Sequence, residues 1–228
     1  MLSTTFWPLL TRLGEAQILF PLVGAAAAWL WLGAGQGGQA LRWLLSLAAA
    51  VALTTASKLA FIGWGWGIAA WDFTGISGHA LCSAASLPML AWVALTGRAR
   101  HVQQWAAGLG LALAALVAYS RLEVNAHSAS ESISGFALGA LVNAISLCGR
   151  AEAITPRLAA PLWLPAALTA CLLLLPLKAP RSRSHDWITA LSVQWSGRSQ
   201  PFMRDQLHQR HRAPMAPAVQ GPWQRLPP

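Results

Sequence analysis

Charged residues are scarce in this chain. Asp, Glu, Lys and Arg make up only 10% of its 228 residues, and just seven residues are acidic, whereas soluble domains average about 25% charged residues. Hydrophobic residues make up 55% of the chain, and the mean hydropathy is +0.46. This composition excludes an ordinary soluble domain and predicts a membrane protein.

Cysteine is also rare. The three cysteines, Cys82, Cys148 and Cys171, all lie inside apolar runs. Their number is odd and their spacing matches no known metal-binding pattern, so they predict apolar packing rather than a disulfide framework or a metal site. We expect the protein to need no metal and no cofactor.

Basic charge is concentrated at the end of the chain. Residues 178–228 hold eight Lys or Arg against Asp186 and Asp205, which accounts for +6 of the formal net charge of +9. No basic face is expected on a folded soluble module, which argues against nucleic-acid binding. Contact with anionic lipid headgroups is the preferred interpretation.

Six apolar segments approach the roughly 20 residues that a helix needs to cross a bilayer. They cover residues 16–34, 41–62, 80–96, 103–120, 132–149 and 160–177. Arg12 ahead of the first segment also fits a signal peptide, but the segment's length and its two tryptophans favour a span. We therefore predict an all-α fold, an integral membrane six-helix bundle over residues 1–180. The polar, proline-rich residues 181–228 predict a basic, poorly ordered tail, with a short membrane-surface helix at 187–195 as an alternative for its start.

The predicted topology gathers the unusual polar residues on one side of the membrane. Six crossings place residues 63–79 and 121–131 on the same side, and Lys58 lies near that end of the second span. Ionisable side chains in membrane segments are costly, about 2.5–3.5 kcal/mol at mid-bilayer, and are functional by default. We therefore interpret this set as one site that handles phosphate. Asp72 and Asn125 lie nearby, and we expect turn chemistry for both.

His127 and Glu131 are four residues apart, which places them on one helical face. A carboxylate beside an imidazole fixes one ring nitrogen and leaves the other free as a nucleophile or base. Arg121, six residues before His127, can bind two phosphate oxygens. The alternative for Arg121 is a helix-end salt bridge to Glu123 or Glu131.

Ser77-Gly78-His79 opens the third span. Free backbone amides at a helix N-terminus favour anions, Gly78 allows close approach, and His79 can donate a proton to a leaving oxygen. Lys58 is the only lysine in the first 177 residues. The alternatives are a helix cap for Ser77 followed by an interfacial histidine, His79, and a lysine that snorkels to the membrane surface for Lys58.

These residues, in this order, resemble the type 2 phosphatidic acid phosphatase superfamily, over about residues 50–150 and, through the six-span layout, most of residues 1–177. Three positions depart from that family's motifs. Gly65 stands where the first motif has arginine, Ile76 stands where the second has proline, and Glu131 stands where the third has aspartate. Backbone amides of residues 63–67 are expected to compensate for the absent arginine.

The resemblance implies a role for each residue. His127 would attack phosphorus to form a phosphohistidine, Glu131 would orient His127, and His79 would protonate the leaving group. Four residues would hold the phosphoryl oxygens: Lys58, Ser77, Gly78 and Arg121. The implied activity is metal-independent hydrolysis of a lipid-linked phosphate monoester or pyrophosphate, with a phospholipid or polyprenyl phosphate as substrate.

Two other functions remain open. The absent arginine fits a catalytically degenerate member that binds lipid headgroups or a membrane partner. A small transporter is the third interpretation, although no broken helices occur in paired halves. Haloperoxidase activity is disfavoured because those relatives are soluble. The distribution of arginines between the two sides, together with the family's habit, favours a bacterial inner-membrane protein whose site faces the periplasm.

Overall fold

The computed structural model describes residues 2–148, 157–180 and 182–212, and these residues fold into nine α-helices with short 3₁₀ and π-helical turns. The helices are α1 (Leu2–Thr11), α2 (Ala16–Ala28), α3 (Gly37–Trp64), α4 (Gly78–Ala94), α5 (Arg100–Glu123), α6 (Ala129–Leu147), α7 (Leu164–Lys178), α8 (Ser184–Ser196) and α9 (Arg204–Arg212). A π-helical turn, Trp29–Gly33, extends α2, and 3₁₀ turns occur at Arg12–Gly14 and Ala69–Trp71. The prediction of an all-α fold is confirmed for the described residues.

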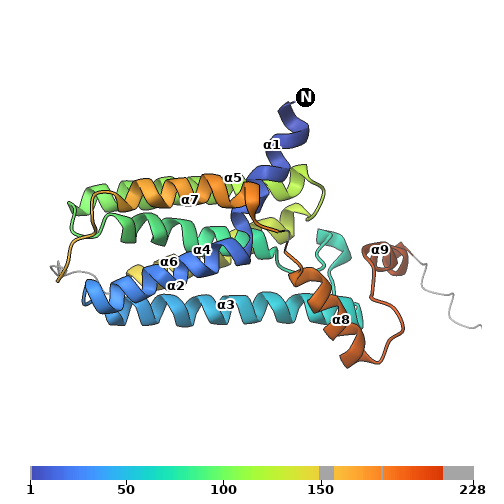
Figure 1. The fold of residues 1–228 in the computed structure, drawn as a ribbon. Helices are drawn as coiled ribbons and strands as arrows, with labels where there is room; N and C mark the ends of the chain where they lie inside the picture. The colour runs from blue at the N-terminus through green and yellow to red at the C-terminus, as the bar shows by residue number, and fades with distance from the viewer. Residues whose placement is uncertain (1, 149–156, 181, 213–228) are drawn as a thin grey trace, which may run out of the picture.

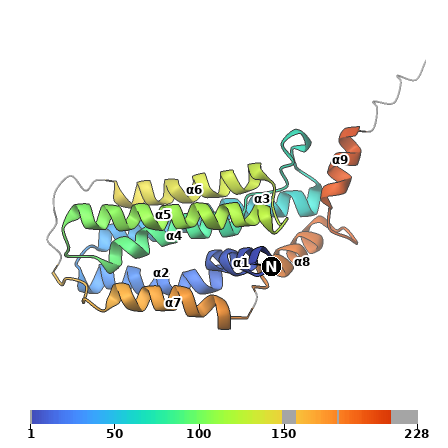
Figure 2. The same cartoon turned by 90° about the horizontal axis from the view of Figure 1, so that it is seen from above.

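Four helices are long and apolar enough to cross a membrane, which indicates a membrane protein. They are Ala16–Gly33, Gly37–Trp64, Arg100–Glu123 and Ala129–Leu147. The other two predicted spans also form apolar helices, α4 and α7, but with 17 and 15 residues they are shorter than the roughly 20 residues of a typical membrane span. Helices α2 to α7 lie side by side along a common axis, as Figures 1 and 2 show.

Helix α4 lies at the centre of this bundle and packs against α2, α3, α5, α6 and α7. Nearly all of its side chains are buried, so it is apolar on every face. Small residues allow α6 to approach closely. A methyl group added at Gly139 would lie 2.6 Å from the Ala84 side chain and from the Leu81 carbonyl oxygen. The N-terminus of α4 is therefore rigidly placed between its neighbours.

The prediction of a poorly ordered tail is wrong for residues 182–212. Helix α8 packs against α3, and α9 packs against the 3₁₀ turn Ala69–Trp71 and brings Leu207 to Phe61 and Ile62, at the right of Figure 1. Phe202 is buried with Phe61 and Ile62, its amide donates to the Ile62 carbonyl at 2.8 Å, and its ring lies 5.7 Å from that of Phe61. A few apolar residues are thus enough to pack this mostly polar segment against α3. The average composition of the segment did not indicate these contacts. The tail prediction for residues 213–228 lies outside the described part of the chain. The helix considered at 187–195 falls within α8.

Candidate functional site

The three polar pieces of the sequence meet at one end of the bundle. The Ile76 amide donates to Ser57 Oγ at 3.0 Å, next to Lys58, and the Ser77 amide donates to the Glu131 carbonyl at 3.0 Å. The His127 amide donates to the Arg121 carbonyl at 3.2 Å, which closes the turn after α5. These hydrogen bonds tie α3, α4, α5 and α6 together at the predicted site.

His127 and Glu131 form the predicted pair. His127 Nδ1 and Glu131 Oε2 are 2.6 Å apart, which leaves His127 Nε2 as the free ring nitrogen. Glu131 is also the third residue of α6, where it completes a capping box with Ser128. This box uses Glu or Gln at that position, so local helix chemistry accounts for the glutamate. The Ser-x-x-Glu pattern is a sequence signal that identifies the start of this helix.

Glu131 is fully buried, and donors surround both of its oxygens. Oε1 accepts from the Thr74 amide at 2.7 Å and from the Thr74 hydroxyl, while Oε2 accepts from the Ser128 amide at 3.2 Å. Arg204 Nη2 lies 2.9 Å from each of the two oxygens. A buried charge needs such partners, so this arrangement holds an ionised Glu131 in one orientation against His127.

The start of α4 has the features of an anion site. Ser77 is the N-cap residue, yet its side chain makes no capping hydrogen bond. Its Oγ is fully buried and has no hydrogen-bond partner among the described residues. A methyl group at Gly78 would lie 3.7 Å from Lys58 Nζ, so the ammonium group lies over the first turn of the helix. Lys58 therefore lies within the site, and neither the capping role for Ser77 nor the surface role for Lys58 is observed.

Gly75 accounts for this close approach of Lys58. Its φ of +148° lies in a region that other residues rarely adopt, and an added methyl group would lie 3.1 Å from Lys58 Cγ. The loop before α4 can pack against α3 only because this position has no side chain.

Gly65 ends α3, and two of the amides expected to replace the absent arginine, those of residues 65 and 66, are instead bonded within the end of the helix. Gly65 has φ +74°, its amide donates to Phe61 at 2.7 Å, and the Trp66 amide donates to Ala60 at 3.2 Å. This is the usual glycine-based end of a helix. The amides of residues 65 and 66 donate to carbonyl groups at the end of the helix, so they are not free to bind an anion.

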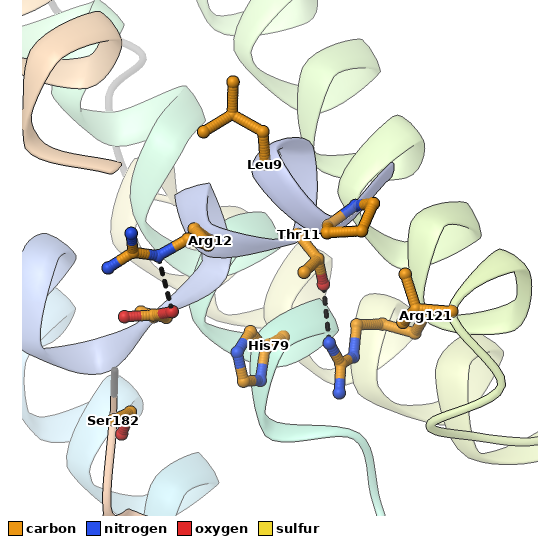
Figure 3. Close-up of a pocket in the computed structure, with 9 residues that line it drawn as sticks. Leu9, Thr11, Arg12, His79, Arg121 and Ser182 are labelled. Atoms are coloured by element: carbon orange, nitrogen blue, oxygen red, sulfur yellow. Dashed lines mark hydrogen bonds and ion pairs between the residues drawn. The ribbon is translucent and has the colours of Figure 1, made fainter. Parts of the chain in front are cut away.

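Two cavities meet at Arg121. One, of about 510 Å³, is lined by Lys58, His127, Arg121 and residues of the C-terminal segment. The other, of about 520 Å³, is lined by His79, Arg121 and the N-terminal residues around Thr11. Figure 3 shows the second cavity, with His79 and Arg121 next to each other beneath the segment that carries Thr11 and Arg12. The two histidines thus line different cavities, and Arg121 lines both.

Arg121 makes a single side-chain hydrogen bond in the described structure, from Nη1 to Thr11 Oγ1 at 2.6 Å. Its Nε is buried and unpartnered among the described residues. The alternative of a salt bridge to Glu123 or Glu131 is not observed within the described part of the chain. Most of the guanidinium group therefore remains available to a ligand.

Burial lowers the pKa of the His127 imidazole below its ordinary value, although the hydrogen bond to Glu131 acts in the opposite direction. The nearby charges of Lys58 and Arg121 lower this pKa further. A neutral imidazole at physiological pH is the form in which Nε2 has a free lone pair.

Sequence reasoning missed Thr74, Arg204 and His208. Asp72, expected to serve a turn, has φ +48° and does so, but its carboxylate also binds Arg204 at 2.5 Å and His208 at 2.7 Å. Asn125 lies in a turn with φ +53°. The segment that supplies Arg204 and His208 is distant in sequence and mostly polar, and no local pattern indicated its contact with Asp72. Among the described residues, no cluster of three His, Cys, Asp or Glu side chains is placed to hold a metal ion.

Comparison with known proteins found no matching family model and no matching solved structure. The chain is 33% identical over 210 residues to a Klebsiella pneumoniae protein described as "Uncharacterized 22.5 kDa protein in cps region". The match covers 90% of this chain and 98% of that protein. The chain therefore belongs to the same family as the 22.5 kDa protein of the Klebsiella pneumoniae cps region.

Proposed function

We propose that this protein is a membrane phosphatase that hydrolyses a lipid-linked phosphate monoester or pyrophosphate through a phosphohistidine, without a metal ion. The observation that carries the proposal is the contact between His127 Nδ1 and Glu131 at 2.6 Å, at the same end of the bundle as the start of α4, where the buried Ser77 hydroxyl has no partner among the described residues. A nucleophile held by an orienting carboxylate beside phosphate-binding groups is the arrangement that covalent phosphoryl transfer requires.

In the first step, His127 Nε2 forms a bond to phosphorus while the bond from phosphorus to the leaving oxygen breaks. His79 donates its proton to that oxygen. In the second step, a water oxygen attacks phosphorus and gives a proton to His79, the bond to Nε2 breaks, and inorganic phosphate leaves. Lys58, Arg121 and the α4 N-terminus stabilise the charge on the phosphoryl oxygens in both steps.

The two cavities fit an in-line displacement. The nucleophile His127 lines one cavity and the acid His79 lines the other, and Arg121 lines both. The leaving group would lie on the His79 side, where Pro8 and Leu9 of α1 and Val124 supply apolar walls. An apolar wall beside cationic groups suits a substrate with a lipid tail and an anionic head.

The arrangement supports membership of the type 2 phosphatidic acid phosphatase superfamily and a six-helix membrane bundle in which the short helices α4 and α7 also cross. Among the described residues, four arginines flank the helices at the end opposite the site: Arg42, Arg98, Arg100 and Arg157. Under the positive-inside rule these favour an inner-membrane protein with its site in the periplasm. Alkaline phosphatase fused after residue 228 tests this orientation, because α8 and α9 pack at the same end of the bundle as the site. An inactive fusion, together with fluorescence from a reporter that folds only in the cytoplasm, would show that the site faces the cytoplasm instead.

The activity test uses the full chain in detergent, with EDTA present. Phosphatidate, phosphatidylglycerol phosphate and undecaprenyl pyrophosphate are offered, and phosphate release is measured. The variant His127→Ala should abolish release, whereas His101→Ala, which changes an exposed histidine at the start of α5, should leave it unchanged. Equal rates for His127→Ala and the unchanged protein would show that the nucleophile is assigned wrongly.

A catalytically degenerate, headgroup-binding protein is the second candidate. The observation that favours it is Gly65 at the position of the first-motif arginine, in a backbone conformation that suits glycine. Saturable binding of these lipids with no phosphate release across the whole panel would select this alternative.

A further inference from the structure

We propose that Arg204, supplied by the C-terminal segment, is a positioning residue of the site: it holds Glu131 against His127 and places a permanent positive charge beside them. This inference rests on the proposed function and adds a part to the catalytic machinery that the sequence motifs do not contain.

The geometry of the guanidinium group is the first argument. Arg204 Nη2 lies 2.9 Å from both Glu131 oxygens, while Nη1 lies 2.5 Å from Asp72 Oδ2 and 3.0 Å from the Asp72 carbonyl oxygen. Nη2 also lies 3.2 Å from Thr74 Oγ1. One side chain therefore joins the carboxylate that orients the nucleophile to the loop before α4. The planar, forked donor group of arginine suits this arrangement, whereas lysine cannot reproduce it.

The way the segment docks is the second argument. The ring of Phe202 lies where a side chain at Gly65 would project, since an added methyl group would be 2.9 Å from it. Phe202 is two residues from Arg204 and is anchored to the Ile62 carbonyl. The position from which the family's motif arginine would extend is thus occupied by the segment that delivers Arg204. His208 on α9 holds Asp72 from the other side at 2.7 Å.

The position of the charge is the third argument. His127 Nδ1 and Arg204 Nη2 contact the same oxygen, Glu131 Oε2, at 2.6 Å and 2.9 Å. Among the described residues, the charged or titratable groups that act on His127 are Glu131, Lys58, Arg121 and His79, and Arg204 and His185 line the same cavity. Arg204 offsets the negative charge of Glu131, so that the carboxylate can orient the imidazole without keeping it protonated.

The test compares the variants Arg204→Ala and Arg204→Lys with Arg210→Ala. Arg210 lies over the Phe202 ring, 4.3 Å from its centroid, and makes no contact with Glu131, so it controls for docking of the segment. Arg204→Ala should lower kcat/KM by about 10-fold or more, as loss of a group that orients a functional histidine does. It should also move the acid limb of the pH profile to higher pH. Arg204→Lys should keep the acid limb in place but recover only part of kcat/KM, and Arg210→Ala should match the unchanged protein.

A second readout separates this inference from the proposed function. Histidine NMR of the full chain in detergent follows the titration of His127 directly, and Arg204→Ala should raise its midpoint whether or not any substrate is hydrolysed. Absence of turnover in the unchanged protein would overturn the phosphatase assignment alone. If folded Arg204→Ala keeps both kcat/KM and the His127 midpoint, Arg204 has no positioning role. If Arg204→Ala fails to fold, Arg204→Lys decides: full kcat/KM in that variant overturns the role of the forked contact.

Discussion

Replacing Ser77 by alanine should make the protein more stable and less active. The Ser77 hydroxyl is fully buried at the start of α4 and has no hydrogen-bond partner among the described residues. A side chain that is left unsatisfied in the folded protein destabilises it, and such residues gather where a ligand supplies the missing partner. The variant Ser77→Ala removes the unpaired group and leaves the surrounding packing almost unchanged.

Both magnitudes follow from hydrogen-bond energetics. An unsatisfied buried polar group costs about 1–3 kcal/mol, so its removal should raise the melting temperature by about 2–4 °C for each kcal/mol in a chain of this size. A hydrogen bond to a charged phosphoryl oxygen is worth about 1.5–3 kcal/mol. Its loss should lower kcat/KM by roughly 10- to 150-fold.

Ser86 offers a matched control on the same helix. It is fully buried, and its Oγ also has no partner in the described structure, but it lies more than two turns further along α4. Ser86→Ala should raise the melting temperature by a similar amount and leave kcat/KM unchanged. The assay is thermal unfolding in detergent, read by circular dichroism, beside phosphate release from one lipid substrate.

The refuting result is a Ser77→Ala protein with a lower melting temperature and unaltered kcat/KM. That outcome would mean that the hydroxyl stabilises the folded protein and never meets a ligand. A loss of activity shared equally by Ser86→Ala would show that α4 packing, not a contact to phosphate, sets the rate.

Two further predictions concern pH and packing. Because burial lowers the pKa of His127, its neutral, nucleophilic form should persist below the ordinary histidine pKa of about 6.5. The acid limb of kcat/KM plotted against pH should therefore lie below about pH 6.5. An acid limb above about pH 7 would contradict a buried His127 with a lowered pKa. Replacing Gly139 by leucine should push α6 away from Ala84 and Leu81 on α4. This overpacking should lower the melting temperature by several degrees. The control, Gly108→Leu, lies at a position with open space around it and should leave the melting temperature almost unchanged.

The sequence determined the helical class and most of the site. Apolar runs of near-bilayer length have one stable solution in lipid, a helix that satisfies its own backbone. Each of the six predicted segments contains a helix in the described part of the chain. Two helices, α4 and α5, separate Ser77 from His127, so the chain returns to the end of the bundle where Lys58 lies. The pairing of His127 with Glu131 is local, since four residues span one helical turn, so spacing was sufficient to predict it.

Only the tertiary structure decided what surrounds that pair. Arg204 reaches Glu131 across 73 positions of sequence, and Phe202 occupies the space beside Gly65. Contacts of this kind depend on how the chain folds back on itself, and no periodicity or motif encodes them locally. The scarcity of charge identified a membrane protein with a polar site at one end, whereas the folded C-terminal segment decided which cations surround that site.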